Sequence, residues 1–408
     1  MADNNENKVL NVPHLRFPEF SGEWEEHTLS EYLEFKNGLN PDAKRIGSGL
    51  PFISVMDILS EGVINYDNIR GKVNATEKEI ECFGVKDGDL LFQRSSETLE
   101  DVGRANVYMD NRTAIYGGFV IRGRKIGNYD PLFFKYLLAT PLARKRTCRM
   151  GAGAQHFNIG QEGLSKISLY FPSIEEQRKI AEFLSLIDER IATQNKIIED
   201  LKKLKSAISK YLFARKDLLE TTICLSNIAT LKNGYAFQSG KYNALGKWKI
   251  LTITNVPGER YINDEDCNCI INLPNDIQDH QVLKEGDILI SLTGNVGRVS
   301  LCKNGNYLLN QRVGLLQLAK NVNQEFLYQI LSSQRFENSM IACSQGAAQM
   351  NIGKGDVENY VLPYSSNGNN ILWVAKILHS YDECIINELR RLTLLTMQKQ
   401  YLLTQMFI

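Results

Sequence analysis

Basic side chains gather in one stretch of the sequence, where they could bind an anion such as a phosphate. Residues 102–149 contain ten Lys and Arg against two Asp, a net charge of +8. Residues 16–101 instead carry 18 acidic and nine basic side chains. A run of this kind can be a solvated helix face. Because this one crosses several expected elements and Gly-rich loops, it favours an anion-binding surface.

Candidate nucleic-acid contacts are the polar side chains in loops after expected strands, since loops carry binding more often than strands do. Arg and Lys suit guanine or phosphate, and Asn and Gln suit adenine. The Gly-rich loop at 149–156 could let the backbone approach a phosphate, or could be a structural turn. The candidates are Lys36, Asn37, Arg94, Ser95, Arg104, Arg149, Gln155, His156, Lys232, Asn233, Thr293, Asn295, Arg298, Arg312 and Gln349.

Motifs for bond-making chemistry are missing from the sequence. A DNA amino-methyltransferase needs an (N/D)-P-P-(Y/F) word, and the chain has no Pro-Pro pair. The string GKYNALGKW has the wrong spacing for a P-loop. Cys267, Cys269 and His280 do not complete a four-ligand metal site. His156 has no accompanying nucleophile or carboxylate pattern, so a base contact or a loop filler fits better than a general base. We expect no catalysis, metal or cofactor in this chain.

The chain repeats itself once, and the repeat defines the elements that must position the candidates. Several words recur in one order at a lag of 193–198 residues, with small insertions between them. VKDGDLLFQRS, which starts at Val85, answers LKEGDILISLT, which starts at Leu283. VGR at 102–104 answers VGR at 296–298. Two copies of one unit therefore make up the protein, after a short tail.

Equivalent positions in the two copies separate shared from variable contacts. Arg104 and Arg298 coincide, which favours a phosphate contact or a structural role for both. Specificity should come from residues that differ, such as Arg94 against Leu292. His156 against Gln349 is a second such pair.

Each copy has two parts, which predicts an α+β fold. About 150 residues of alternating short apolar runs and turn signals predict a mixed α/β domain. A long heptad pattern follows in each copy and is typical of a coiled coil. A single amphipathic helix lying on the domain is the alternative. Ser173 is the expected N-cap of the first long helix, and Asn369 or Asn370 of the second. The first seam is Ile180, Leu184, Ile187, Ile191, Gln194, Ile198, Leu201, Lys205, Ile208 and Leu212, and the second runs from Val374 to Met406.

Polar residues interrupt both seams at equivalent steps and can select the register. Gln194 and Lys205 interrupt the first, and Glu388 and Lys399 interrupt the second. Parallel packing would place the two lysines together. Antiparallel packing, in the register where residue numbers sum to about 593, would place Lys205 opposite Glu388 and Gln194 opposite Lys399. We therefore expect two long antiparallel coiled-coil helices.

The whole chain resembles the specificity (S) subunit of type I restriction–modification enzymes. LRFPEFSGEWEEHTLSEYLEFKNG, from Leu15, resembles the family's entry into its first target-recognition domain. FPSIEEQRKIAEFLSLIDERI, from Phe171, resembles the family's P-x-x-E-Q-x-x-I-A helix entry. The second copy keeps Pro363 but lacks the EEQ word. The domains expected are a tail (1–21), two pseudo-symmetric target-recognition domains (22–172 and 217–366) and two spacer helices (173–216 and 367–408).

The resemblance implies a DNA-reading subunit without its own catalysis. Each α/β domain would read one half of a split, asymmetric site in double-stranded DNA. The helices would set the gap between the half-sites and dock two modification (methyltransferase) subunits. Restriction (translocase–nuclease) subunits would join them. S-adenosylmethionine, ATP and Mg²⁺ would belong to those partners and not to this chain.

Composition sets the class of protein. Apolar residues make up 43% and charged residues 23%, as in globular proteins, and no apolar run is long enough to span a membrane. The polar N-terminus is no secretory signal, so we expect a bacterial or archaeal cytoplasmic protein with eight reduced Cys. The alternative function is a coiled-coil adaptor whose two domains bind protein instead of DNA. An orphan recognition subunit without an active partner is a third possibility.

Overall fold

Two α/β domains with the same strand order follow one another along the chain, as the repeat predicts. Contacts divide the chain into two compact units. The first unit runs to Asn195 and includes Arg391–Ile408, and the second is Lys196–Arg390. The computed structural model describes residues 10–153, 155–344 and 350–408; the candidate Gln349 therefore lies outside the described residues.

The first unit contains two four-stranded sheets. One is antiparallel, with the order β2-β10-β6-β8. The other, β4-β3-β9-β5, is mixed because β3 pairs with β9 in parallel. The strands of the first unit are β1 (Glu25–Thr28), β2 (Leu33–Asn37), β3 (Ile46–Ile53), β4 (Gly71–Val73), β5 (Gly84–Val85), β6 (Leu90–Gln93), β7 (Ser95–Ser96), β8 (Ala105–Val107), β9 (Ala114–Tyr116), β10 (Val120–Lys125), β11 (Phe157–Asn158) and β12 (Ser168–Phe171). Its shorter helices are α1 (Val55–Ile58), α2 (Glu77–Phe83), α3 (Pro131–Ala139), α4 (Pro141–Arg149) and α5 (Gln161–Ser165).

The second unit repeats this topology. Its antiparallel sheet has the order β14-β21-β18-β19, and its mixed sheet has the order β16-β15-β20-β17. Its strands are β13 (Thr221–Cys224), β14 (Ala229–Asn233), β15 (Trp248–Leu251), β16 (Asn268–Ile270), β17 (Val282–Leu283), β18 (Ile288–Ser291), β19 (Val299–Leu301), β20 (Tyr307–Leu309), β21 (Val313–Leu318) and β22 (Val361–Tyr364). Its shorter helices are α7 (Gln324–Leu331), α8 (Gln334–Cys343) and α9 (Lys354–Glu358).

Equivalent tight turns lead into the central strands β6 and β18. Lys86 N donates to the Asp89 carboxylate at 2.9 Å, and Lys284 N donates to Asp287 at 2.8 Å. Gly88 and Gly286, inside these turns, have φ of +81° and +87°, which favours glycine. The KDGD and KEGD words that recur in the two copies are therefore turns.

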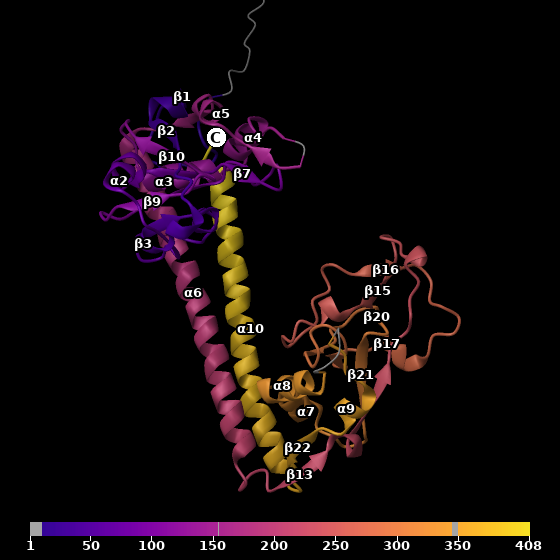
Figure 1. Ribbon diagram of the computed structural model, residues 1–408. Coiled ribbons are helices and arrows are strands. Elements are labelled where there is room, and N and C mark those ends of the chain that lie inside the picture. The colour runs from indigo at the N-terminus through magenta and orange to yellow at the C-terminus, as the bar shows by residue number, and fades with distance from the viewer. Residues whose placement is uncertain (1–9, 154, 345–349) are drawn as a thin grey trace, which may run out of the picture. The chain divides into compact units, whose positions relative to one another are not determined.

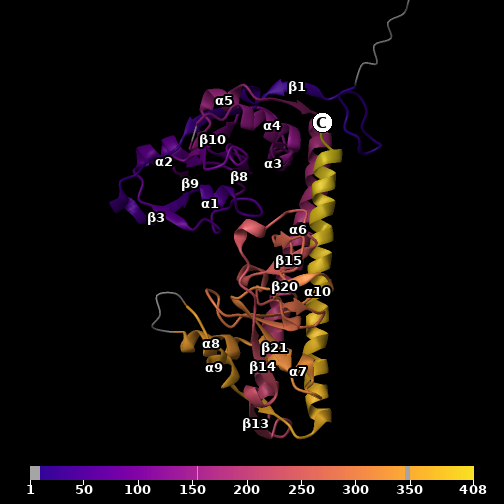
Figure 2. The same cartoon turned by 90° about the vertical axis from the view of Figure 1, so that its right-hand side faces the viewer.

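The long helices α6 (Ile174–Ala214) and α10 (Gly368–Gln405) lie side by side (Figure 1). In the first unit, Leu184 of α6 and Leu403 and Met406 of α10 join one apolar core. In the second unit, Leu212 near the end of α6 packs with Val374 near the start of α10. The helices therefore run antiparallel, which confirms the predicted direction. Within its own unit, α3 lies between the sheets and the long helices, and α7 lies next to α10 (Figure 2).

The register of the helix pair differs from the expected one. Lys205 Nζ lies 2.5 Å from Asp382 Oδ1, and Lys399 Nζ lies 2.5 Å from Asp188 Oδ1. Residue numbers sum to 587 in both pairs, and not to about 593, so the predicted pairing of Lys205 with Glu388 and of Gln194 with Lys399 is wrong. The physical reason is that Asp188 and Asp382 each lie one residue after a seam position and are still within reach of the lysine on the opposite helix.

The sequence predicted the N-cap of α6 correctly and the N-cap of α10 incorrectly. Ser173 Oγ accepts from Glu176 N at 3.3 Å, which confirms the N-cap of α6. For α10 the prediction was wrong by two or three residues, because Asn367 Oδ1 accepts from Asn369 N at 3.0 Å. Asn370 instead donates its amide to Leu218 O at 3.0 Å.

Candidate nucleic-acid interface

Three segments of the first domain meet at one surface. Arg94 N, just after β6, donates to Phe119 O in the turn between β9 and β10 at 2.9 Å. Arg94 O accepts from Ile159 N at 3.0 Å, and β7 pairs with β11. The Ser95 hydroxyl bonds to the Asn158 side chain. The fold thus brings the candidates Arg94 and Ser95 to the end of the Gly-rich loop.

The Gly-rich loop begins where α4 ends and has a structural need for one glycine. Ala152 and Asn158 exchange backbone hydrogen bonds of 2.9 and 2.8 Å across the loop. Gly153 has φ +145°, and a Cβ there would lie 1.9 Å from His156 O. The loop is therefore a structural turn at Gly153. Its candidates Arg149, Gln155 and His156 are exposed.

Lys36 and Asn37 at the end of β2 have partners inside the first domain. Lys36 Nζ lies 2.8 Å from Cys82 Sγ and 5.4 Å from the centre of the Phe83 ring. Asn37 O accepts from Tyr116 OH at 3.3 Å, and the Asn37 amide lies beside that of Gln161. Both residues are therefore bound to neighbouring side chains of the first domain.

Arg104 and Arg298 occupy equivalent places, each next to a carboxylate. Gln93 N donates to Arg104 O at 2.8 Å, and Ser291 N donates to Arg298 O at 2.9 Å. Arg104 forms an ion pair of 2.7 Å with Asp101, and Arg298 Nε lies 3.5 Å from Glu337. Each arginine also lines a hollow, of about 730 Å³ for Arg104 and about 190 Å³ for Arg298. The larger hollow carries further cations, at Lys135, Arg144, Lys145 and Lys399.

Much of the basic run at 102–149 is used inside the domain. Arg122 is buried and donates to Gly84 O at 2.8 Å. Arg112 pairs with Asp67 and Asp110, and burial lowers the pKa of Lys135 to about 8. Other cations of the run also bond within the domain, as Arg124 does with Asp89, Arg146 with Glu26 and Lys125 with Tyr129 O. The surface charge is therefore smaller than the sequence count suggests.

The second domain repeats the same meeting of segments. Leu292 N donates to Arg312 O at 3.0 Å, and Ile352 N donates to Leu292 O at 2.9 Å. Thr293 and Asn351 form an isolated antiparallel β-bridge. Arg312 and Asn295 are exposed beside it. At the end of β14, Lys232 is half-buried and Asn233 is exposed, with Asn233 O 3.1 Å from His280 Nε2.

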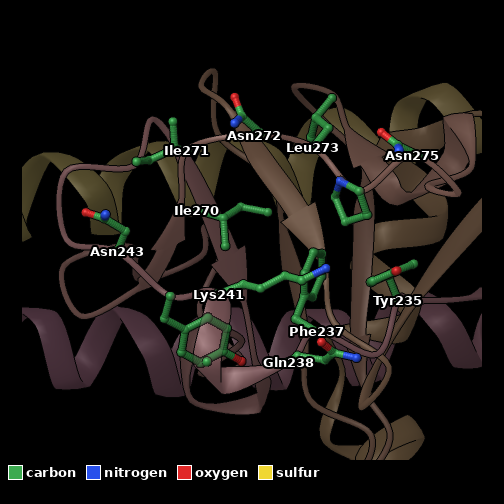
Figure 3. Close-up of a pocket in the computed structure, with 13 residues that line it drawn as sticks. Tyr235, Phe237, Gln238, Lys241, Asn243, Ile270, Ile271, Asn272, Leu273 and Asn275 are labelled. Carbon is green, nitrogen blue, oxygen red and sulfur yellow. The ribbon is translucent and has the colours of Figure 1, made fainter.

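A hollow of about 440 Å³ lies beside the turn that carries Arg312, and the sequence did not predict it. Tyr235 O accepts from Gln311 N at 3.0 Å, which joins the hollow to the turn that carries Arg312. Figure 3 shows Lys241 beside Phe237, with Asn272 and Asn275 along one edge. The signal available was the run of aromatic and amide residues that follows Lys232-Asn233. A surface of rings and amides suits planar groups with polar edges.

Among the described residues, no group of three or more His, Cys, Asp or Glu is arranged to hold a metal ion. Cys267 is half-buried, and its partial removal from water raises the pKa of its thiol to about 11. Over the same residues, none of the helices has the length and apolar character needed to cross a membrane.

Comparisons with known proteins agree on one family. A model described as the type I restriction modification DNA specificity domain matches residues 21–203 and again 220–397. The type I restriction enzyme MjaVIII specificity subunit of Methanocaldococcus jannaschii is 25% identical, over 86% of this chain and 83% of that protein. The type I restriction enzyme EcoKI specificity subunit of Escherichia coli is 26% identical over 36% of this chain and 32% of that protein.

A solved structure supports the fold. The S subunit of a type I restriction-modification system from M. genitalium aligns with a TM-score of 0.59 and 17% identity. The alignment covers 97% of this chain and 99% of that one. The two chains therefore share their fold along nearly their whole length.

Proposed function

Because the chain belongs to the family of type I restriction–modification specificity subunits, we propose that it reads a bipartite, asymmetric DNA site. Each α/β domain reads one half-site through the surface where its three segments meet. The chain itself makes and breaks no bond. It works in the cytoplasm of a bacterium or archaeon.

One observation carries the proposal: the two domains present different side chains on the same backbone arrangement. Arg94 and Leu292 donate equivalent backbone hydrogen bonds, to Phe119 O and Arg312 O. Base edges are distinguished by side-chain hydrogen bonds and apolar contacts. Leu292 is buried in the core of the second unit, so the exposed difference between the domains lies at Phe119 and Arg312. Two domains of one fold with different exposed side chains at this place suit two different half-sites.

The helix pair supports docking of modification subunits. Apolar side chains that no core covers remain exposed on both long helices. In the first unit they are Leu186 on α6 and Leu394, Met397 and Tyr401 on α10. In the second unit they are Ile197, Leu204 and Tyr211 on α6 and Leu372 and Trp373 on α10. Exposed apolar surface of this kind marks protein contacts. One modification subunit binds at each unit, giving two, and restriction subunits join them; S-adenosylmethionine, ATP and Mg²⁺ bind to these partners.

Mapping of methylated adenines across the genome, with and without this gene, tests the proposal. Loss of a motif with two unlike halves and a fixed gap is the expected result. An uninterrupted or palindromic motif would refute the bipartite reading.

Gel shifts at two salt concentrations test direct DNA binding, with the chain assembled with its modification subunits. Affinity should fall steeply between about 50 and 200 mM salt, because phosphate contacts release counterions. A complex that binds no DNA at low salt would favour the protein-binding adaptor.

A further inference from the structure

Phe119 is an aromatic side chain that the family assignment leaves without a role. It lies at the tip of the turn between β9 and β10 and is 68% exposed. Among the described residues, no apolar cluster and no ring contact includes it. Single exposed apolar side chains are common, so exposure alone assigns nothing. The position of this ring is what carries the argument.

The backbone under the ring is fixed on several sides. Phe119 O accepts from Arg94 N, and Val120 N donates to Gly117 O, both at 2.9 Å. Gly117 N donates to Ile53 O at 2.9 Å. At Gly118 a Cβ would lie 1.8 Å from Asn40 Oδ1, so the turn packs closely against that side chain. A rigid turn therefore presents a ring that costs little entropy to immobilise on a partner.

The surroundings of the ring are polar and suited to DNA. Arg94 Nη1 reaches Gly118 O at 3.4 Å, which places its guanidinium next to the turn. Ser95 and Asn158 follow along the paired strands β7 and β11. Proteins that bend DNA insert apolar side chains such as Phe as wedges between base steps. Here hydrogen-bonding groups lie beside such a side chain.

The second domain shows that the fold does not need an aromatic residue here. Arg312 takes the equivalent place, because its carbonyl accepts from Leu292 N as that of Phe119 accepts from Arg94 N. Beside Arg312 the second domain has the hollow lined by Tyr235 and Phe237. The fold therefore tolerates a non-aromatic residue at this place, and the exposed ring of Phe119 is not part of the first domain's core.

We propose that Phe119 inserts its ring into the base stack of the half-site read by the first domain. The inference rests on the proposed DNA-reading function and deepens it. Insertion requires one base-pair step to unstack, and pyrimidine–purine steps unstack most easily. The first domain's half-site therefore contains such a step at the insertion point, selected by deformability in addition to hydrogen bonds.

Fluorescence of 2-aminopurine tests the insertion, because this base brightens when it loses its stacking. The assembled complex is mixed with duplexes of the mapped site that carry 2-aminopurine at each position of both half-sites in turn. The modification subunits flip their target adenines out of the stack, so those positions brighten in both half-sites and in every variant. Apart from them, the native protein should brighten one step of one half-site. Phe119→Ala should abolish that signal, Phe119→Trp should keep it, and the matched Arg312→Ala change in the other domain should leave it unchanged.

Binding constants give a second readout. Phe119→Ala should weaken binding about 5- to 150-fold, the range for loss of one base–ring stack. The salt dependence should not change, since no phosphate contact is lost. Because the ring is exposed, the variant should melt at the native temperature.

Each failure has a separate meaning. If the native complex binds no bipartite DNA, the proposed function fails. If it binds and Phe119→Ala keeps both affinity and fluorescence, the insertion is refuted and the reading function stands. If Phe119→Ala instead prevents assembly with the modification subunits, the ring belongs to a protein contact and the insertion is likewise refuted.

Discussion

The cations of residues 102–149 divide into those that hold the domain together and those that remain at its surface. Arg122 is buried and donates to a backbone carbonyl. Arg104 is 53% exposed, and among the described residues its ion-pair partner is the partly exposed carboxylate of Asp101. An exposed ion pair contributes little to stability, so Arg104 can exchange Asp101 for a phosphate at small cost. Arg298 has the same freedom beside Glu337.

Replacing Arg104 or Arg298 with Ala should therefore weaken DNA binding equally on all sequences. Each change should lower the slope of log K against log salt by about 0.9, the contribution of one phosphate contact. Gel shifts over a salt series measure the slope, and methylation mapping checks the motif. Asp101→Asn is the matched control, because it frees Arg104 without removing its charge. A changed motif in either arginine variant would show that the residue reads a base.

At the residue scale the sequence predicts the loops better than it predicts the contacts. It placed Arg94 and Ser95 just after a strand, in a segment that does meet the end of the Gly-rich loop, although Ser95 lies in the short strand β7 and not in a loop. It could not show that Arg112 turns to acidic neighbours, since that depends on tertiary packing. The sequence did not indicate that Phe119 is exposed, because the string GGFVIRG is typical of one apolar strand. Only the structure shows that the turn ends after the phenylalanine.

At the scale of elements, the duplicated strands and heptads were readable because they have strict periods. The register of the helix pair was not readable, because the heptad pattern identifies only the residues of the seam and not the charged residues next to it. Asp188 and Asp382 follow seam positions by one residue, and each receives the lysine of the opposite helix. Both pairs also contact the α/β domain of their own unit. Tyr136 OH donates to Asp188 at 2.9 Å, and Gln329 donates to Asp382 at 2.6 Å.

Exchange of the charges of one pair tests this register. Lys399→Glu should destabilise the first unit by about 1–3 kcal/mol, because a half-buried attraction becomes a repulsion. Adding Asp188→Lys should recover part of that loss, since the Tyr136 hydroxyl can also accept a hydrogen bond. Lys135 lies near enough to interact with the charge at position 188 but forms no direct contact with Asp188, so it limits the recovery without preventing it. Thermal unfolding measures both, at about 2–4 °C per kcal/mol.

The other pair provides a matched comparison for that exchange. Asp382 also accepts from Arg260 at 3.0 Å, so a lysine at 382 would face a second cation. The double exchange of Lys205 and Asp382 should therefore not recover stability. Recovery in that pair, or its absence in the Asp188–Lys399 pair, would contradict the contacts described.

At the scale of the whole molecule, duplication gives two α/β domains of one fold, and each unit contains a part of both long helices. The helix α6 has 41 residues and α10 has 38. An α-helix rises about 1.5 Å per residue, so each of these helices extends over about 60 Å. If the pair sets the gap between the half-sites, its length and the helical repeat of DNA must match.

Lengthening both helices should change the gap in steps set by the DNA turn. Three heptads inserted into each, after Gln194 and after Leu392, preserve the seam and add about 32 Å. That length is close to one DNA turn of about 34–36 Å, so the second domain returns to the same face of the duplex. The methylated motif should keep both halves and gain a gap longer by about nine or ten base pairs. One heptad adds only about 10 Å and leaves the domains out of phase, so that control should bind weakly at every gap. An unchanged gap with three heptads would show that the helices do not set the spacing.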